Sequence, residues 1–236
     1  MRASGLRYSI AATIGALRQR LPALDPFSRR SWSQEGEDLL LSRLLESRES
    51  GFYVDVGAHD PFRFSNSAYF YARGWRGLSI EPDPSGADLI RRYRPRDIVI
   101  NLGVGAEPST LTFFRFNEPA LNTFDADLAR ERLKNAAYRV VEEKKVEVDR
   151  LDRIFAVHLT SGQKIDFMSV DAEGVDLVVL KSNDWNRFRP AYVVAETLNL
   201  ELATMSSNET VAFMRDVGYR PVAAAFSSVF FADSRS

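Results

Sequence analysis

Short apolar runs that predict strands alternate with helical stretches along most of the chain. Each such run ends in an acid, an Asn or a Gly, as buried strands that open into a loop commonly do. The predicted strands are "GFYVDVG", "RGLSIEPDP", "DIVINLGVG", "QKIDFMSVDAEG" and "RPAYVVAET". Helical spacing or helix-end signals mark "EGEDLLLSRLLES", "SNSAYFYARG", "PSGADLIRRYRP" and "VDLVVLKS". Repeating strand–helix–strand units predict a parallel sheet with helices on both faces.

The pattern changes after residue 205. "SNETVAFMRDVG" predicts a helix with Ser207 or Asn208 as its N-cap, and "YRPVAAAFSSVFFAD" predicts two strands joined by a tight turn at Phe226–Ser228. The expected fold class is therefore α/β and Rossmann-like, with a mostly parallel seven-stranded sheet that ends in a C-terminal antiparallel hairpin. The charge-rich stretch 125–145 predicts a surface helix with solvated charges.

The N-terminal segment has a separate pattern. Leucine and isoleucine recur at helical spacing from Leu6 to Leu21, and residues 1–32 hold six arginines and one acid. This predicts a basic amphipathic helix followed by a linker. The apolar stripe fits packing on its own domain or on a second subunit of a homo-oligomer, and it also fits peripheral contact with an anionic membrane. We expect no transmembrane helix or signal peptide, and a cytoplasmic protein.

Composition excludes several kinds of chemistry. The formal net charge of −1 argues against a nucleic-acid partner held by bulk positive charge. The absence of cysteine excludes thiol nucleophiles and Cys-based zinc sites. With only two histidines, any metal would need oxygen ligands, chiefly carboxylates.

Polar residues and glycines gather where the predicted strands end. Ligands of open parallel sheets bind beyond the carboxyl ends of the strands, so these positions are candidates for a binding site. They are Asp55, Gly57, Ala58 and His59 after the first strand, Glu81 after the second, Asn101 and Gly103 after the third, Asp171, Glu173 and Gly174 after the fourth, and Glu196 after the fifth.

The loop after the first strand discriminates between ligands. Glu81 lies 24 residues after Gly57, a separation at which an acid can accept the ribose hydroxyls of a nucleoside. A phosphate-binding loop needs several backbone N–H groups, but Pro61 has none, and Asp55 and Asp60 would repel phosphate. A ribose-bearing cation such as S-adenosylmethionine fits better, although other Rossmann ligands stay open.

Several separate segments carry a family resemblance. "SQEGEDLLL", "FYVDVGAHDPFRFSNSAYFYARGWRGLSIEPDP", "LNTF" and "IDFMSVDAEGVDLVVLKSNDWNRFRPAYVVAET" resemble, in order and spacing, the FkbM-type family of S-adenosylmethionine-dependent methyltransferases. The resemblance covers roughly residues 33–232. Asp60 stands where the family has Asn or His, and Ala172 where Val is more usual, but no charge expected at the site is lost.

The resemblance implies a Rossmann-like methyltransferase domain over residues 33–236, with S-adenosyl-L-methionine as cofactor. It implies a small-molecule or glycan acceptor, O-methylated at a hydroxyl of a sugar or secondary metabolite. Together with the strand-end residues, it gives the expected cofactor-binding positions Gln34, Asp55, Gly57, Ala58, Ser65, Asn66, Glu81, Asn101 and Gly103.

Three residues are expected to carry the chemistry. His59 is a candidate general base, with a loop histidine that bonds backbone as the alternative. Asp171 and Glu173 are candidates for a base, an acceptor clamp or Mg²⁺ ligands, and Glu173 could instead cap the next helix. Two carboxylates are few for a tight metal site, so we expect no tightly bound metal. A nucleotide-dependent oxidoreductase and a non-catalytic nucleoside-binding protein remain as alternatives. The absence of a Gly-x-Gly-x-x-Gly motif disfavours the oxidoreductase, and the acids retained at the strand ends disfavour the non-catalytic protein.

Overall fold

The computed structural model describes residues 28–198 and 200–235. The chain divides into two units, residues 1–31 and 32–236, and the second is described here. The basic amphipathic helix expected within residues 1–32 lies almost wholly outside the described residues. Within the described part of the chain, no helix is both long enough and apolar enough to cross a membrane.

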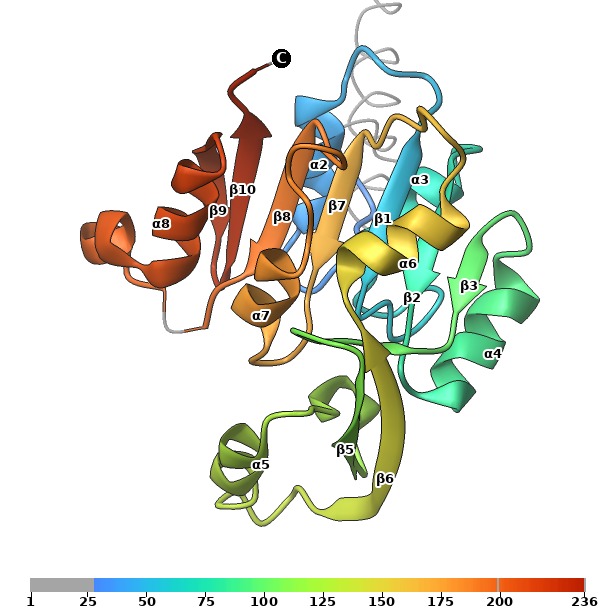
Figure 1. The fold of residues 1–236 in the computed structure, drawn as a ribbon, viewed down its shortest axis with the longest axis vertical. Helices are drawn as coiled ribbons and strands as arrows, with labels where there is room; N and C mark the ends of the chain where they lie inside the picture. Colours follow the sequence, from blue (N-terminus) through green and yellow to red (C-terminus); the bar gives the residue numbers. More distant parts are fainter. Residues whose placement is uncertain (1–27, 199, 236) are drawn as a thin grey trace, which may run out of the picture. The chain divides into compact units, whose positions relative to one another are not determined.

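The second unit is built on a seven-stranded sheet, and each of these strands appears in Figure 1. Its strands are β1 (Phe52–Val56), β2 (Arg76–Ile80), β3 (Ile98–Ile100), β7 (Phe167–Val170), β8 (Tyr192–Glu196), β9 (Tyr219–Ala225) and β10 (Ser228–Asp233). The spatial order is β3-β2-β1-β7-β8-β10-β9. Only β10 runs in the opposite direction to the other six strands, which confirms the predicted mostly parallel sheet with a C-terminal hairpin.

Helices cover both faces of this sheet, as predicted. They are α2 (Glu37–Leu44), α3 (Ala68–Tyr71), α4 (Pro84–Tyr93), α6 (Leu151–His158), α7 (Asp176–Lys181), α8 (Glu209–Asp216) and the 3-10 helix η3 (Leu202–Ser207). Side chains alternate along a strand, so β1 contributes Val54 to a core cluster that includes α6, α7 and α8, and Tyr53 to another that includes α2 and α3. All five residues of β1 are buried, as its continuous apolar run requires.

A second sheet was not predicted. It consists of β4 (Gly103–Val104), β5 (Ser109–Phe116) and β6 (Val140–Asp149) in the order β4-β6-β5, with η2 (Pro119–Leu121) and α5 (Ala126–Arg132) between β5 and β6. The helix predicted over 125–145 is therefore wrong beyond Arg132. Val146 and Val148 are buried while Lys145 and Glu147 are exposed, so the period-two pattern of a strand was present but largely hidden among charges.

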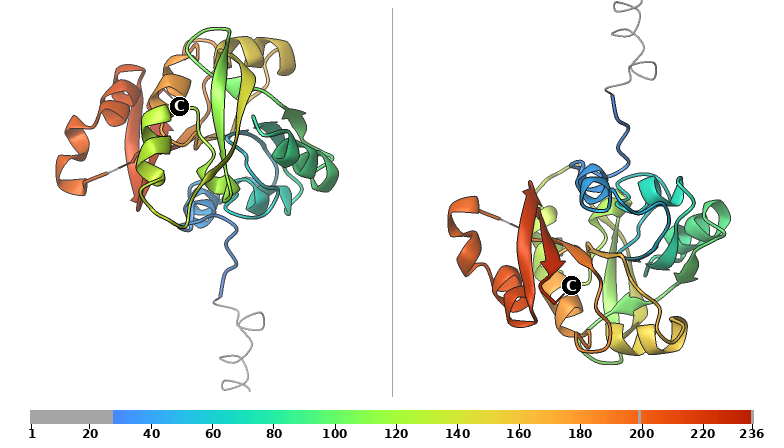
Figure 2. Two further views of the ribbon diagram at one scale, coloured as in Figure 1. Left: turned by 90° about the horizontal axis from the view of Figure 1, so that it is seen from below. Right: turned by 90° about the horizontal axis from the view of Figure 1, so that it is seen from above.

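The small sheet lies beyond the carboxyl ends of the parallel strands. Figure 1 shows β5, β6 and α5 below the main sheet, and the left view of Figure 2 shows them lying across this edge. Side-chain contacts tie the segment to the main sheet's loops; for example, the Thr123 hydroxyl donates to the Glu173 carbonyl at 2.7 Å, and Arg63 pairs with Glu118 at 2.7 Å. The segment therefore forms one wall of the space in which a ligand would bind at this edge of the sheet.

Candidate functional site

A cavity of about 740 Å³, counted out to its open mouth, lies at the carboxyl edge of the main sheet. Of the residues expected at the site, those lining it are Gln34, Gly57, His59, Glu81, Asp171 and Glu173. Its apolar wall includes Val56, Ile80, Pro82, Leu102, Val104 and Phe113.

Asp55 does not line this cavity. It accepts a hydrogen bond from the Ser67 hydroxyl, inside a buried network centred on Arg94. Arg94 donates to the Tyr53 hydroxyl at 2.8 Å and to Asp97 at 2.9 Å. Burial raises the pKa of Asp55, and the Arg94 charge opposes that rise. Here Asp55 ties β1 to the loops behind the sheet, because it points to the face opposite Val54 and Val56.

Ser65 and Asn66 also lie outside the cavity lining. The Ser65 hydroxyl accepts from the Ala68 N–H at 3.2 Å, next to the start of α3, and from Arg94 at 3.2 Å. The Asn66 amide donates to the Ser169 hydroxyl at 3.0 Å and so connects this loop to β7. Both residues fix the path of the loop that follows β1.

The other three residues expected to bind the cofactor, Asn101, Gly103 and Ala58, do not line the cavity. The Asn101 amide donates to the backbone carbonyls of Glu81, at 2.8 Å, and Pro82, at 3.0 Å. A Cβ on Gly103 would lie 2.6 Å from the Phe124 ring, so this glycine lets the small sheet pack closely. Ala58 is buried and does not line the cavity. The contacts that the structure gives these residues are structural.

Gly57 brings two loops together. Its φ is 79°, in the region that favours glycine, and a Cβ there would lie 1.8 Å from the Asp171 carbonyl oxygen. Any side chain would push the loop after β1 away from the loop after β7. The position therefore fixes how close the candidate cofactor loop lies to the candidate catalytic acids.

Glu81 presents a buried carboxylate to the cavity. Its Oε2 accepts the His59 N–H and its Oε1 the Asp83 N–H, both at 2.7 Å. Burial raises the pKa of Glu81 to about 7, and the two backbone hydrogen bonds oppose that rise. A carboxylate has about four acceptor positions, so two remain for ribose hydroxyls. The contact of Glu81 with a ribose stays a prediction.

His59 adopts a strained backbone, with φ 51°, and lines the cavity. Its Nε2 is buried and has no hydrogen-bond partner among the described residues. Burial lowers the pKa of His59, which keeps the imidazole neutral at physiological pH. A neutral imidazole with a free ring nitrogen can accept a proton.

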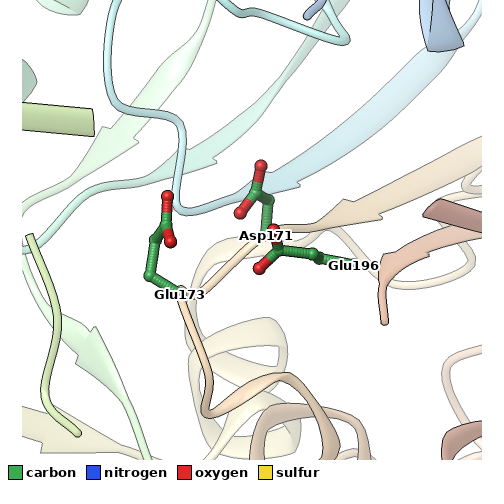
Figure 3. A group of neighbouring side chains, drawn as sticks. All are labelled: Asp171, Glu173 and Glu196. Carbon is green, nitrogen blue, oxygen red and sulfur yellow. The ribbon is translucent and has the colours of Figure 1, made fainter. Parts of the chain in front are cut away.

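Asp171 and Glu173 form a cluster with Glu196, shown in Figure 3, and one oxygen from each lies within 4.8 Å of the others. The cluster can hold a cation. Burial, followed by the charge of Glu196, raises the pKa of Asp171 well above its usual range. Burial, followed by the charge of Asp176, raises the pKa of Glu196 to about 8. Glu196 was visible as a strand-end acid, but only the adjacency of β7 and β8 shows that it meets Asp171.

The loop that carries these acids is held by its neighbours. Asp176 accepts the N–H groups of Ala172, at 2.7 Å, and Gly174, at 3.2 Å, so Asp176 rather than Glu173 binds the backbone ahead of α7. Glu173 instead pairs with Arg132, the last residue of α5. Burial raises the pKa of Glu173, and the Arg132 charge opposes this. Arg132 was not predicted to belong to the site, because it lies in the stretch interpreted as a solvated helix.

Comparison with solved structures finds methyltransferases that align over most of this chain at low identity. A TehB-like S-adenosylmethionine-dependent methyltransferase from Corynebacterium glutamicum aligns at 13% identity over 94% of this chain and 99% of its own, with a TM-score of 0.43. A putative RNA methyltransferase from Pyrococcus horikoshii aligns at 10% identity over 93% and 98%, with a TM-score of 0.45. An O-methyltransferase from Bacillus cereus, solved with S-adenosylhomocysteine, aligns at 10% identity over 98% and 91%, with a TM-score of 0.40.

A search of curated proteins found no match. The model of the methyltransferase FkbM domain matches residues 55–221, which is more than half of the chain and includes the end of β1, all of β2, β7 and β8, and the loops after these strands. The chain belongs to the FkbM methyltransferase family and has its Rossmann-like methyltransferase fold.

Proposed function

We propose that this protein transfers the methyl group of S-adenosylmethionine to a hydroxyl of a small molecule or glycan. One observation carries the proposal: a single cavity contains both a carboxylate suited to ribose, Glu81, and an acidic pair, Asp171 and Glu173. Gly57 holds these two parts close together. Family membership supports the methyl-transfer reaction, and the hydroxyl acceptor is our inference.

The cavity offers a place for each part of the cofactor. Glu81 accepts the ribose hydroxyls, and the apolar wall near Pro82, Leu102 and Val104 covers the adenine faces. The methionine part extends along Gly57 toward Gln34. The sulfonium then faces the acceptor oxygen, which the acidic pair holds in line with the methyl group. The S-adenosylhomocysteine found in the Bacillus cereus relative supports this choice of cofactor.

The reaction is an in-line displacement, so aligning the acceptor oxygen, the methyl carbon and the sulfur is most of the work. The acceptor hydroxyl gives its proton to Nε2 of His59, which is buried, unpaired and neutral. The oxygen lone pair forms the O–CH₃ bond as the C–S bond breaks. The bonding electrons return to sulfur and leave a neutral thioether. Asp171 and Glu173 hold the acceptor on the cavity floor.

Two measurements test the function. Melting-temperature shifts with S-adenosylhomocysteine and with NAD separate a methyltransferase from an oxidoreductase, because only a true ligand stabilises the fold. A radiolabelled methyl-transfer screen against sugars, nucleotide sugars and hydroxylated metabolites then identifies the acceptor. A shift with NAD and none with S-adenosylhomocysteine would overturn the proposal. A shift with S-adenosylhomocysteine, but no transfer to any acceptor, would favour a non-catalytic nucleoside-binding protein.

A variant tests the role of the base. His59→Asn keeps a residue type that tolerates positive φ and leaves the backbone N–H on Glu81. It should lower turnover about 100-fold or more while binding S-adenosylhomocysteine as the parent does. His158→Asn, at the end of α6 and away from the cavity, is the matched control. Normal turnover in His59→Asn would remove His59 from the chemistry.

A further inference from the structure

The acidic cluster is more than a group of surface acids. Oδ1 of Asp171 and Oε2 of Glu196 are both buried, and neither accepts a hydrogen bond within the described part of the chain. A buried carboxylate oxygen without a donor is costly, and in native structures such atoms usually have an unseen partner. Both atoms belong to the cluster in Figure 3, whose three carboxylates come from the ends of two adjacent strands.

The spacing of the cluster fits a metal ion. One oxygen from each of Asp171, Glu173 and Glu196 lies within 4.8 Å of the other two. Oxygens bound to one ion lie at most about 4 Å apart around Mg²⁺ and about 5 Å apart around Ca²⁺, so all three can share one ion after at most a small inward movement of the side chains. The ligand type also agrees, because hard divalent cations prefer carboxylate oxygen.

The charge of the cluster also favours a metal ion. Arg132 pairs with Glu173, so the ionised cluster carries two more negative charges than positive ones. A divalent cation neutralises that excess. A bulky cationic ligand fits less well, because Asp171 and Glu173 line the cavity whereas Glu196 does not. A small ion reaches all three side chains.

We propose that Asp171, Glu173 and Glu196 bind one hard divalent cation, of the Mg²⁺ or Mn²⁺ type, at the floor of the cavity. This revises the expectation that no metal is tightly bound, which counted only two carboxylates. The third ligand, Glu196, follows from the pairing of β7 with β8. Arg132 donates to Oε2 of Glu173 and holds this side chain in place, so it acts as a positioning residue.

The ion deepens the proposed function and rests on it. Three protein ligands leave coordination positions for water and for the acceptor hydroxyl. A hydroxyl bound to a divalent cation loses its proton more readily, so the cation makes the acceptor a better nucleophile. The proton passes to His59, as in the proposed reaction. We infer an acceptor with an oxygen that can coordinate a metal, such as a sugar diol.

A binding experiment tests the site without relying on activity. The full-length protein is titrated with Mn²⁺ in the presence and absence of S-adenosylhomocysteine, and free Mn²⁺ is measured by electron paramagnetic resonance. We expect one saturable site that Mg²⁺ competes for. Glu196→Gln and Asp171→Asn preserve shape and should weaken Mn²⁺ binding about tenfold or more. Glu131→Gln, an exposed carboxylate on α5 that pairs with Lys134, is the control and should bind as the parent does.

The outcomes separate the two proposals. Removing one of three mutually repelling acids should not unfold the protein, and unchanged S-adenosylhomocysteine affinity verifies that each variant is folded. Saturable Mn²⁺ binding that both variants weaken supports the metal site. Binding of S-adenosylhomocysteine without saturable Mn²⁺ binding overturns the metal site and leaves the methyltransferase intact. Mn²⁺ binding that Glu196→Gln does not change also overturns it. Mn²⁺ binding in a protein that does not bind S-adenosylhomocysteine overturns the proposed function instead.

Discussion

Ionisation of Glu81 should govern how cofactor affinity changes with pH. Burial raises its pKa to about 7, against two backbone hydrogen bonds. The ionised carboxylate is the form that accepts both ribose hydroxyls. About a tenth of Glu81 is ionised one unit below that pKa, and about nine-tenths one unit above it. Because apparent affinity scales with the competent fraction, binding of S-adenosylhomocysteine should strengthen about tenfold between pH 6 and pH 8.

Isothermal titration calorimetry at pH 6, 7 and 8 measures this directly. Glu81→Gln should weaken binding by about 1.5–3 kcal/mol, or about 10- to 100-fold, and abolish the pH dependence, since an amide cannot ionise. The exposed acid Glu46, which pairs with Arg43, provides the control as Glu46→Gln. Wild-type affinity that varies less than about twofold over this range, or a Glu81→Gln variant with normal affinity, would refute the reasoning.

The same residue predicts a stability effect with a definite sign. Its pKa in the folded protein lies above the unfolded value of 4.5, so the folded state holds this proton to higher pH. The stability of the free protein should therefore fall as pH rises from about 4.5 to about 7. The difference between wild type and Glu81→Gln should change by up to about 3 kcal/mol across this window, measured by urea unfolding. A difference that is constant with pH would contradict the raised pKa.

Three further predictions concern other parts of the molecule. Gly57→Ala should destabilise the fold by more than about 3 kcal/mol, because its Cβ would collide with the Asp171 carbonyl, and chemical denaturation measures this; Gly162→Ala, with positive φ but open space around it, is the control. Asp171→Asn should abolish turnover and leave S-adenosylhomocysteine affinity nearly unchanged, because the residue acts in the methyl-transfer step; normal turnover would show that its role is structural. A chain starting at Ser31 should bind S-adenosylhomocysteine as the full chain does, since residues 1–30 precede the motifs, and a folded truncation without binding would disprove this.

The main sheet was predictable because its signals are local and strong. The apolar run of β1 and the acids that follow each parallel strand reflect two rules, continuous burial of parallel strands and ligand binding at their carboxyl ends. Together these rules predicted from the sequence that Glu81 and Asp171 lie at the same edge of the sheet. The hairpin followed from the tight turn at Phe226–Ser228, and the structure places its two strands on either side of Phe226 and Ser227.

What could not be predicted depends on three-dimensional neighbours. Glu196 meets Asp171 because β8 pairs with β7, and strand order is not written in the spacing of the motifs. Asp55 follows the motif but occupies the opposite face of β1, where Arg94 binds the same network. β6 was missed because the charged residues of "EEKKVEVD" hid the alternation that buries Val146 and Val148.

The near-contact between Gly57 and the Asp171 carbonyl has a consequence for turnover. The two loops touch backbone to backbone, so neither can swing away without the other. The product must nevertheless leave. The opposite wall is attached through side chains, which include Arg132 on Glu173, the Thr123 hydroxyl, Arg115 on Asp83 and the partly exposed Arg63–Glu118 pair. Release of spent cofactor should therefore be a hinge event of the small sheet. The rate of cofactor release should rise with ionic strength, because salt weakens the ion pairs that attach the small sheet and does not affect the contact at Gly57.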